Sequence, residues 1–356
     1  MKNSATNPIS ANTANALEAG IDIAKRVHQI HAHDKETGEL IRLQLNTEEL
    51  YAFFDGRPRS HIALEACGGS QYIARRFLAM GHDVELLHPK AVKPFVQGGK
   101  SDKNDAAGIY AAMRQPHVTR VGIKSIETQN ISTMLTIREG VVKEKVTHIN
   151  RVHGILLEYG IVVSKGSKFT QEAEKALETL GERCGQNAFL LQEMQDEIQA
   201  VRDCIKRLNR LENALKKMLE ENEMAQLFMT VPYVSTITAA AIVSSMPNPR
   251  AFRNARAYAA SLGLVPGHTG SGGKIILLGI TKRGDKLLRK LLVQVAISFS
   301  RRVRKEERPS YFMRLLKKPK LLGYVAIAAH LARSLWAMAM KKEAFKYDIA
   351  PTMKKA

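Results

Sequence analysis

Hydrophobic positions in the first third of the chain switch repeatedly between a two-residue and a helical period. Strand-like patterns occupy residues 20–31, 40–45, 61–66 and 83–87. Helical patterns occupy residues 47–54, 70–80, 90–96 and 102–114. Glycine, proline or a polar turn separates most of these segments. The order predicts strands in succession at the start, followed by strands that alternate with helices.

Residues 121–228 have a helical period, with predicted loops at 165–168 and 181–186. One apolar series is spaced by three or four residues, with charged residues between its members: Ile198, Val201, Ile205, Leu208, Leu211, Leu215 and Leu219. This spacing is typical of a coiled coil or a helical hairpin. Such an apolar face can pack within its own domain, or it can mediate self-association of the chain.

The last third reads as mostly helical, with a glycine-rich segment at residues 263–273 and a short strand at 275–278. We therefore expect an α/β domain followed by α domains. The predicted parts are a loose tail at 1–17, a ribonuclease-H-like mixed-sheet domain at 18–120, a helical or coiled-coil region at 121–228, a basic domain at 229–345, and a tail at 346–356.

Charge changes the picture, because it is concentrated in one part of the chain. The net charge is +20. Residues 231–356 hold 24 Lys and Arg against 5 Asp and Glu. The corresponding numbers are 15 against 13 in residues 1–120, and 15 against 16 in residues 121–230. A solubilising surface would not need this concentration, so we expect a polyanionic partner such as nucleic acid. The candidate phosphate contacts are Lys100, Lys103, Lys274, Lys282, Arg283, Lys286, Arg289 and Lys290.

Cysteine usage and hydropathy exclude several classes of protein. Cys67, Cys184 and Cys204 form no C-x-x-C pair, which argues against a disulfide framework or a zinc site. The N-terminal residues lack the apolar core of a signal peptide. No apolar run reaches the ~18 residues of a membrane span. We expect a cytoplasmic protein with no membrane partner.

Four acidic residues are candidates for a metal site. Asp102 and Asp105 lie three residues apart at the predicted start of a helix, where they either repel each other or share a cation. Asp22 and Glu65 lie in apolar, strand-like runs, where a buried carboxylate is costly. Oxygen ligands of this kind suit Mg²⁺, and a Mg²⁺ pair can catalyse phosphoryl transfer. Taken without Asp22 and Glu65, Asp102 is better interpreted as a helix cap, and Asp105 as a solvated acid in the first turn.

Ser271 is a candidate nucleophile inside the glycine-rich segment. Glycines on both sides let the backbone approach a substrate and expose the hydroxyl. A serine in such a segment is more often only a turn residue.

Several motifs in a fixed order resemble the DEDD-type transposases of bacterial insertion sequences. The N-terminal motifs are Gly20-Ile-Asp22-Ile-Ala-Lys25, Leu64-Glu65-Ala66-Cys67-Gly68 and Lys100-x-Asp102-x-x-Asp105-Ala106. The C-terminal motifs are Ala259-Ala-Ser-Leu-Gly-Leu-Val-Pro266, Ser271-Gly272, Thr281-Lys-Arg-Gly284 and Leu287-Leu-Arg289. The resemblance covers about residues 18–345. The chain departs from the family at Pro232-Tyr233-Val234-Ser235, where Pro-Gly-apolar-Gly is usual, and at Cys67, where Thr is common.

The resemblance implies a mechanism. It implies a domain similar to a Holliday-junction resolvase, with Mg²⁺ bound by Asp22, Glu65, Asp102 and Asp105, and a transient covalent link between Ser271 and DNA. It also implies a bridge RNA that pairs with donor and target DNA, and a homo-oligomer, a dimer or tetramer, with active sites shared between subunits. The alternative is a metal-dependent, structure-specific endonuclease that uses water as its nucleophile. A non-catalytic nucleic-acid-binding scaffold is a third possibility, against which the intact set of four acids argues.

Overall fold

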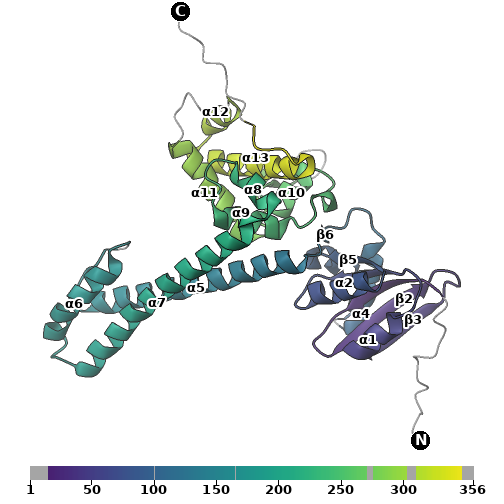
Figure 1. Cartoon of the computed structure of the whole chain (residues 1–356), viewed down its shortest axis with the longest axis horizontal. Coiled ribbons are helices and arrows are strands. Elements are labelled where there is room, and N and C mark those ends of the chain that lie inside the picture. The colour runs from purple at the N-terminus through teal and green to yellow at the C-terminus, as the bar shows by residue number, and fades with distance from the viewer. Residues whose placement is uncertain (1–14, 100, 165, 271–275, 303–309, 347–356) are drawn as a thin grey trace, which may run out of the picture. The chain divides into compact units, whose positions relative to one another are not determined.

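The protein forms two compact units. A computed structural model describes residues 15–99, 101–164, 166–270, 276–302 and 310–346. One unit is built from the chain up to Ile126 together with Met246–Asn254, and the other from Glu127–Ser245 and the chain from Ala255 onward (Figure 1). The finer division of the chain near residues 120 and 228 stays a prediction.

The first unit contains a mixed sheet of six strands. They are β1 (Leu17–Asp22), β2 (Val27–Asp34), β3 (Leu40–Asn46), β4 (His61–Glu65), β5 (Asp83–Leu87) and β6 (Arg120–Val121), in the order β3-β2-β1-β4-β5-β6. β1, β4 and β5 run parallel, whereas β2 is antiparallel to β1 and β3, and β6 is antiparallel to β5. The predicted α/β class of the N-terminal domain is confirmed, and the sheet is consistent with a ribonuclease-H-like fold.

The prediction of one strand over residues 20–31 is wrong. The structure has a hairpin there, in which Ile21 of β1 pairs with Ile30 of β2. Ile23 and Val27 keep the two-residue period of Ile21 across the turn, although the core residues of β2, Ile30 and Ala32, lie in the opposite phase. The periodicity alone therefore cannot locate the turn.

Helices cover both faces of this sheet. α1 (Thr47–Phe54) and α2 (Ser70–Ala79) pack on one face, in a core that includes Ile21, Phe54, Leu64 and Phe77. α3 (Pro89–Val92), the 3₁₀ helix η2 (Lys93–Phe95) and α4 (Asp102–Met113) belong to the other face, in a core with Ala63 and Leu87. The short 3₁₀ helix η3 (Pro249–Ala251) also belongs to this unit. Residues one position apart along β1 and β4 thus face different helices.

The second unit is mostly helical. Its helices are α5 (Ile126–Glu158, its first residue in the other unit), α6 (Phe169–Arg183), α7 (Ala188–Glu220), α8 (Glu223–Met229), α9 (Thr236–Ser245), α10 (Ala255–Ser261), α11 (Lys286–Arg302), α12 (Ser310–Leu316) and α13 (Lys320–Lys341). Its two strands, β7 (Pro266–Thr269) and β8 (Ile276–Ile280), form an antiparallel pair. The predicted helical character of the C-terminal part is confirmed.

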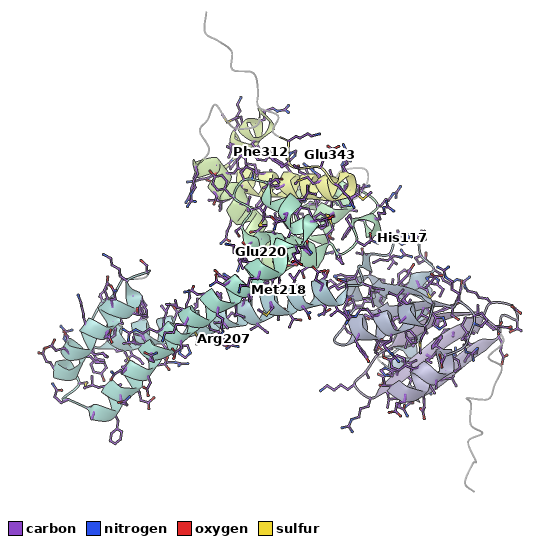
Figure 2. All side chains as sticks on the ribbon, viewed as in Figure 1. His117, Arg207, Met218, Glu220, Phe312 and Glu343 are labelled. Carbon is purple, nitrogen blue, oxygen red and sulfur yellow. The ribbon has the colours of Figure 1, made fainter. Side chains whose placement is uncertain are left out.

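The predicted apolar series lies on α7, which runs back along α5 as a helical hairpin (Figure 1). Six members of the series are buried, whereas Ile205 is 39% exposed. Ion pairs join the two helices, including Arg138 with Glu212 at 2.7 Å and Arg207, labelled in Figure 2, with Glu144 at 3.9 Å. The hairpin interpretation therefore holds.

One helix among the described residues, α13, is long and apolar enough to cross a membrane by length and composition alone. Its buried residues include Tyr324, Ile327, Leu331 and Leu335, and it packs beside α10 and α11. α13 therefore serves as a core helix of the second unit.

Candidate metal centre and serine-flanking hairpin

Asp22 and Glu65 are brought together by the register of two parallel strands. The last pair of residues between β1 and β4 is Ile21 with Leu64, and both side chains enter the core beneath α1 and α2. Asp22 and Glu65 come one residue later, so they face the side of the sheet that α4 covers. Open α/β sheets hold their sites at the carboxyl ends of such strands.

The other two acids come from the first turn of α4. Ser101 is the N-cap, and its hydroxyl accepts a hydrogen bond from the Asn104 amide at 3.4 Å. Asp102 is therefore the first helical residue, not the cap, and its carboxylate is exposed. Asp105 lies three residues on, on the same side of the helix. The partial positive charge of the helix N-terminus favours both carboxylates.

Gly20 is a site residue that the sequence motifs contain but whose role was missed. A Cβ at this position would overlap the backbone of Tyr110 and lie 2.6 Å from the carbonyl oxygen of Ala106 in α4. Only glycine lets β1 approach α4 this closely. A glycine inside a strand pattern is the signal that could have indicated such an approach.

Three of the four acids form a compact cluster. Asp22, Asp102 and Asp105 each offer a carboxylate oxygen within 4.8 Å of the other two. Burial, followed by the charges of Asp105 and Asp102, raises the pKa of Asp22 from 3.8 to about 6. A divalent cation bound by these oxygens would offset that repulsion, so the donor set fits Mg²⁺.

Glu65 lies beside this cluster rather than within it. Burial, followed by the charges of Asp22 and Asp105, raises the pKa of Glu65. The carboxylate therefore lies in the same electrostatic field as the other acids. Burial and the charges of Glu65 and Asp22 also raise the pKa of the Cys67 thiol, so Cys67 stays protonated at neutral pH.

Ser271 and Lys274 lie outside the described residues, as does Lys100. The strands on either side of Ser271 are described: Pro266 of β7 pairs with Ile280 of β8, and Thr269 pairs with Ile276. The predicted short strand near residues 275–278 is confirmed as β8. β7 was missed, because its sequence is embedded in the glycine-rich segment.

The remaining candidate phosphate contacts divide into two groups. Exposed side chains belong to Lys103, Lys282, Arg283 and Lys286. The other two are engaged within the protein: Lys290 pairs with Glu139 at 3.0 Å, and the Arg289 guanidinium donates to backbone carbonyls. Lys290 is itself exposed, so internal pairing rather than exposure alone distinguishes members of one basic stretch that the sequence treats alike.

The turn at Pro232-Tyr233-Val234-Ser235 keeps a glycine-like backbone without glycine. Tyr233 has a φ of 66°, in the left-handed region that favours glycine. Its ring contacts that of Phe299 at a centroid distance of 5.8 Å. Where the family usually has glycine, this chain has Tyr233, which keeps the left-handed backbone and adds a ring contact with Phe299.

Two family models match separate parts of the chain. The model of a DEDD-type IS110 transposase family matches residues 19–161, and that of the "Transposase IS116/IS110/IS902 family" matches residues 225–312. The chain is 33% identical to the transposase for insertion sequence element IS1328 of Yersinia enterocolitica, over 81% of this chain and 85% of that protein. It is 30% identical to the transposase for IS1111A of Coxiella burnetii, over 92% of this chain and 90% of that protein.

The family match over residues 19–161 contains all four acids, and the family match over residues 225–312 contains the β7–β8 hairpin. Both relatives are matched over most of their own length. With the acid cluster on a mixed sheet and a helical C-terminal part, the chain belongs to the IS110/IS116 family of DEDD-type insertion-sequence transposases.

Proposed function

We propose that this transposase cleaves and exchanges DNA strands at a Mg²⁺ site formed by Asp22, Glu65, Asp102 and Asp105. The observation that carries the proposal is the cluster of carboxylate oxygens from Asp22, Asp102 and Asp105 within 4.8 Å of one another. Bound Mg²⁺ would neutralise charge on the attacking and leaving oxygens of the phosphate. The raised pKa of Asp22 supports this role, because burial and then the charges of Asp105 and Asp102 disfavour the free carboxylate, and a bound cation would offset both effects.

The proposed nucleophile is the Ser271 hydroxyl. Its oxygen attacks the scissile phosphorus, the bond from phosphorus to the 3′ oxygen breaks, and the serine proton ends on the released 3′ hydroxyl. A phosphoserine ester to the 5′ end remains and conserves the bond energy. Attack on this ester by the 3′ hydroxyl of another strand reverses the chemistry and joins the exchanged ends.

The proposed partners are donor and target DNA, a bridge RNA that pairs with both, and further copies of the chain. The excess of 24 Lys and Arg over 5 Asp and Glu in residues 231–356 supports polyanion binding. Exposed Lys103, Lys282, Arg283 and Lys286 are the proposed phosphate contacts among the described residues. The long α5–α7 hairpin offers a surface for self-association in a dimer or tetramer.

A structure-specific nuclease is the second candidate. The acid cluster belongs to the first unit alone, and a water activated there would cleave DNA without a serine. In that case Ser271 would be structural, and no covalent intermediate would form.

One experiment separates these functions. Wild-type protein, Mg²⁺, guide RNA and end-labelled DNA are incubated and resolved on denaturing gels. We expect a protein–DNA adduct with wild type and none with Ser271→Ala. Cleavage that persists in Ser271→Ala without any adduct would establish the nuclease instead. Asp102→Asn combined with Asp105→Asn should abolish cleavage, and full activity of that variant would refute the metal site.

A further inference from the structure

The base of the β7–β8 hairpin is held against the turn that follows α10. The Thr281 amide donates to the Val265 carbonyl at 3.0 Å, and the Lys282 amide donates to the Gly263 carbonyl at 3.2 Å. Cβ atoms at Gly263 or Gly284 would overlap the opposite backbone segment. The segment after β8 and the segment before β7 therefore pack backbone against backbone.

Arg289 of α11 joins these two segments. Its Nη1 atom donates to the Leu262 carbonyl at 2.8 Å and to the Arg283 carbonyl at 2.9 Å, with the Asp285 carbonyl at 3.5 Å. Leu262 precedes β7, and Arg283 follows β8. One guanidinium thus spans the segments that lead into and out of the hairpin, and its charge strengthens both hydrogen bonds.

The neighbouring cations have no such arrangement. Lys282, Arg283 and Lys286 are exposed, whereas the side chain of Arg289 is half-buried. The two N–H groups of Nη1 lie in the rigid plane of the guanidinium and serve the Leu262 and Arg283 carbonyls, whereas the hydrogens of an ammonium group rotate freely. Arg289 therefore differs in kind from the phosphate contacts proposed beside it.

We propose that Arg289 is a positioning residue: it fixes the base of the β7–β8 hairpin, whose strands flank Ser271 in the sequence, rather than binding phosphate. The proposal rests on the proposed role of Ser271. It requires that loss of Arg289 slow the chemical step while DNA binding is retained. It also requires that the hairpin base open more readily in the absence of DNA.

The test compares Arg289→Gln with Lys286→Gln and with Lys206→Gln, an exposed lysine on α7 outside the proposed site. DNA affinity is measured across a salt series, and the rate of adduct formation is measured at saturating DNA in a single turnover. Lys286→Gln should weaken binding and lower the slope of log K against log salt by about 0.9, as expected for one lost phosphate contact. Arg289→Gln should leave that slope unchanged and slow adduct formation at least about tenfold, a factor worth roughly 1.4 kcal/mol in the barrier. Lys206→Gln should change neither.

A second readout does not depend on catalysis. Hydrogen exchange at the Thr281 and Lys282 amides should accelerate at least about tenfold in Arg289→Gln, while amides of α13 keep their wild-type protection. If Arg289→Gln unfolds, Arg289→Lys replaces it, with a smaller acceleration because one ammonium bridges the two carbonyls less well. A slope that falls by about one with unchanged exchange would make Arg289 a phosphate contact and overturn the inference. If wild type forms no adduct, the proposed role of Ser271 fails, whereas slope and exchange still decide the role of Arg289.

Discussion

At the scale of single residues, the site that Asp22 helps to form disfavours the charged form of its own carboxyl group. Its pKa of about 6 lies above the ordinary 3.8, because of burial and the nearby charges of Asp105 and Asp102. Between these two values the folded protein binds more protons than the unfolded chain. The free energy of unfolding without metal should therefore fall as pH rises from about 4 to about 6.

The expected loss from this group is about 1 kcal/mol, after allowance for the solvent screening of a half-exposed side chain. Urea denaturation of metal-free protein across this pH range measures it. Asp22→Asn should flatten the profile, since the amide does not titrate. An unchanged profile in Asp22→Asn would assign the pH dependence to other groups.

Magnesium provides the complementary residue-scale prediction. At pH 7.5, saturation with Mg²⁺ at a hundred times its dissociation constant should raise the free energy of unfolding of wild type by about 2.7 kcal/mol. The variant with Asp102→Asn and Asp105→Asn loses two of the three clustered carboxylates, so its stability should not respond. Ca²⁺ serves as a control for size selectivity. An equal response of wild type and variant would place the cation elsewhere.

The candidate acids were predictable because each violates a simple expectation about burial or repulsion. Asp22 and Glu65 lie in apolar strands, and the structure places them one residue beyond the pair Ile21–Leu64. Whether Ser101 or Asp102 caps α4 was not predictable, because both residue types cap helices well. The requirement for Gly20 depends on the approach of α4, which is a tertiary contact that no local pattern encodes.

At the scale of elements, the position of α4 on β1 depends on Gly20. Gly20→Ala should destabilise the protein by about 1–3 kcal/mol, because its Cβ would meet the backbone of Tyr110 and Ala106. Separation of β1 from α4 should also weaken Mg²⁺ binding, measurable by calorimetry. Gly140→Ala in α5 is the matched control, since a Cβ there meets nothing within 4 Å and gains helix propensity of up to about 1 kcal/mol. Equal stability of the two variants would contradict the close-packing argument.

The α5–α7 hairpin offers a second prediction at this scale. Leu215→Ala should cost about 2–5 kcal/mol, because this side chain is fully buried. Ile205→Ala should cost less than half of that, since Ile205 is 39% exposed in the same series. Urea denaturation compares the two variants. A larger loss for Ile205 would indicate that its exposed face is covered by another copy of the chain, which a concentration series would reveal.

Elements were predictable where local chemistry marks their ends. The capping box of Asn46 and Glu49 defines the start of α1, as the sequence indicated. The turn between β1 and β2 was missed because its apolar residues continue the strand period. β7 was missed because its glycine-rich composition also predicts a loop. Its strand conformation depends on pairing with β8, which local sequence does not show.

At the scale of the whole molecule, the concentration of positive charge in the last third is a feature that no single motif explains. The chain has no Asp or Glu between residues 308 and 342. Within this stretch, Lys317, Lys318 and Lys320 are exposed at the junction of α12 and α13. Arg301 lies near Lys320: a hydrogen bond with Ser300, a hydrogen bond with Arg301 and the charges of Lys320 and Arg301 lower the pKa of Tyr324. This junction lies beyond residue 312, where the second family match ends.

Simultaneous replacement of Lys317, Lys318 and Lys320 by Gln should therefore weaken nucleic-acid binding in a salt-dependent way. If all three contact phosphates, the slope of log K against log salt should fall by about 2.7, and a single contact would lower it by about 0.9. The matched control replaces Lys206, Lys216 and Lys217 of α7, which are equally exposed but lie in residues 121–230, where 15 Lys and Arg face 16 Asp and Glu. Because those acids cancel the local field, the control should change the slope by less than one contact. Equal effects of the two triple variants would mean that total charge, not its concentration in the last third, governs binding.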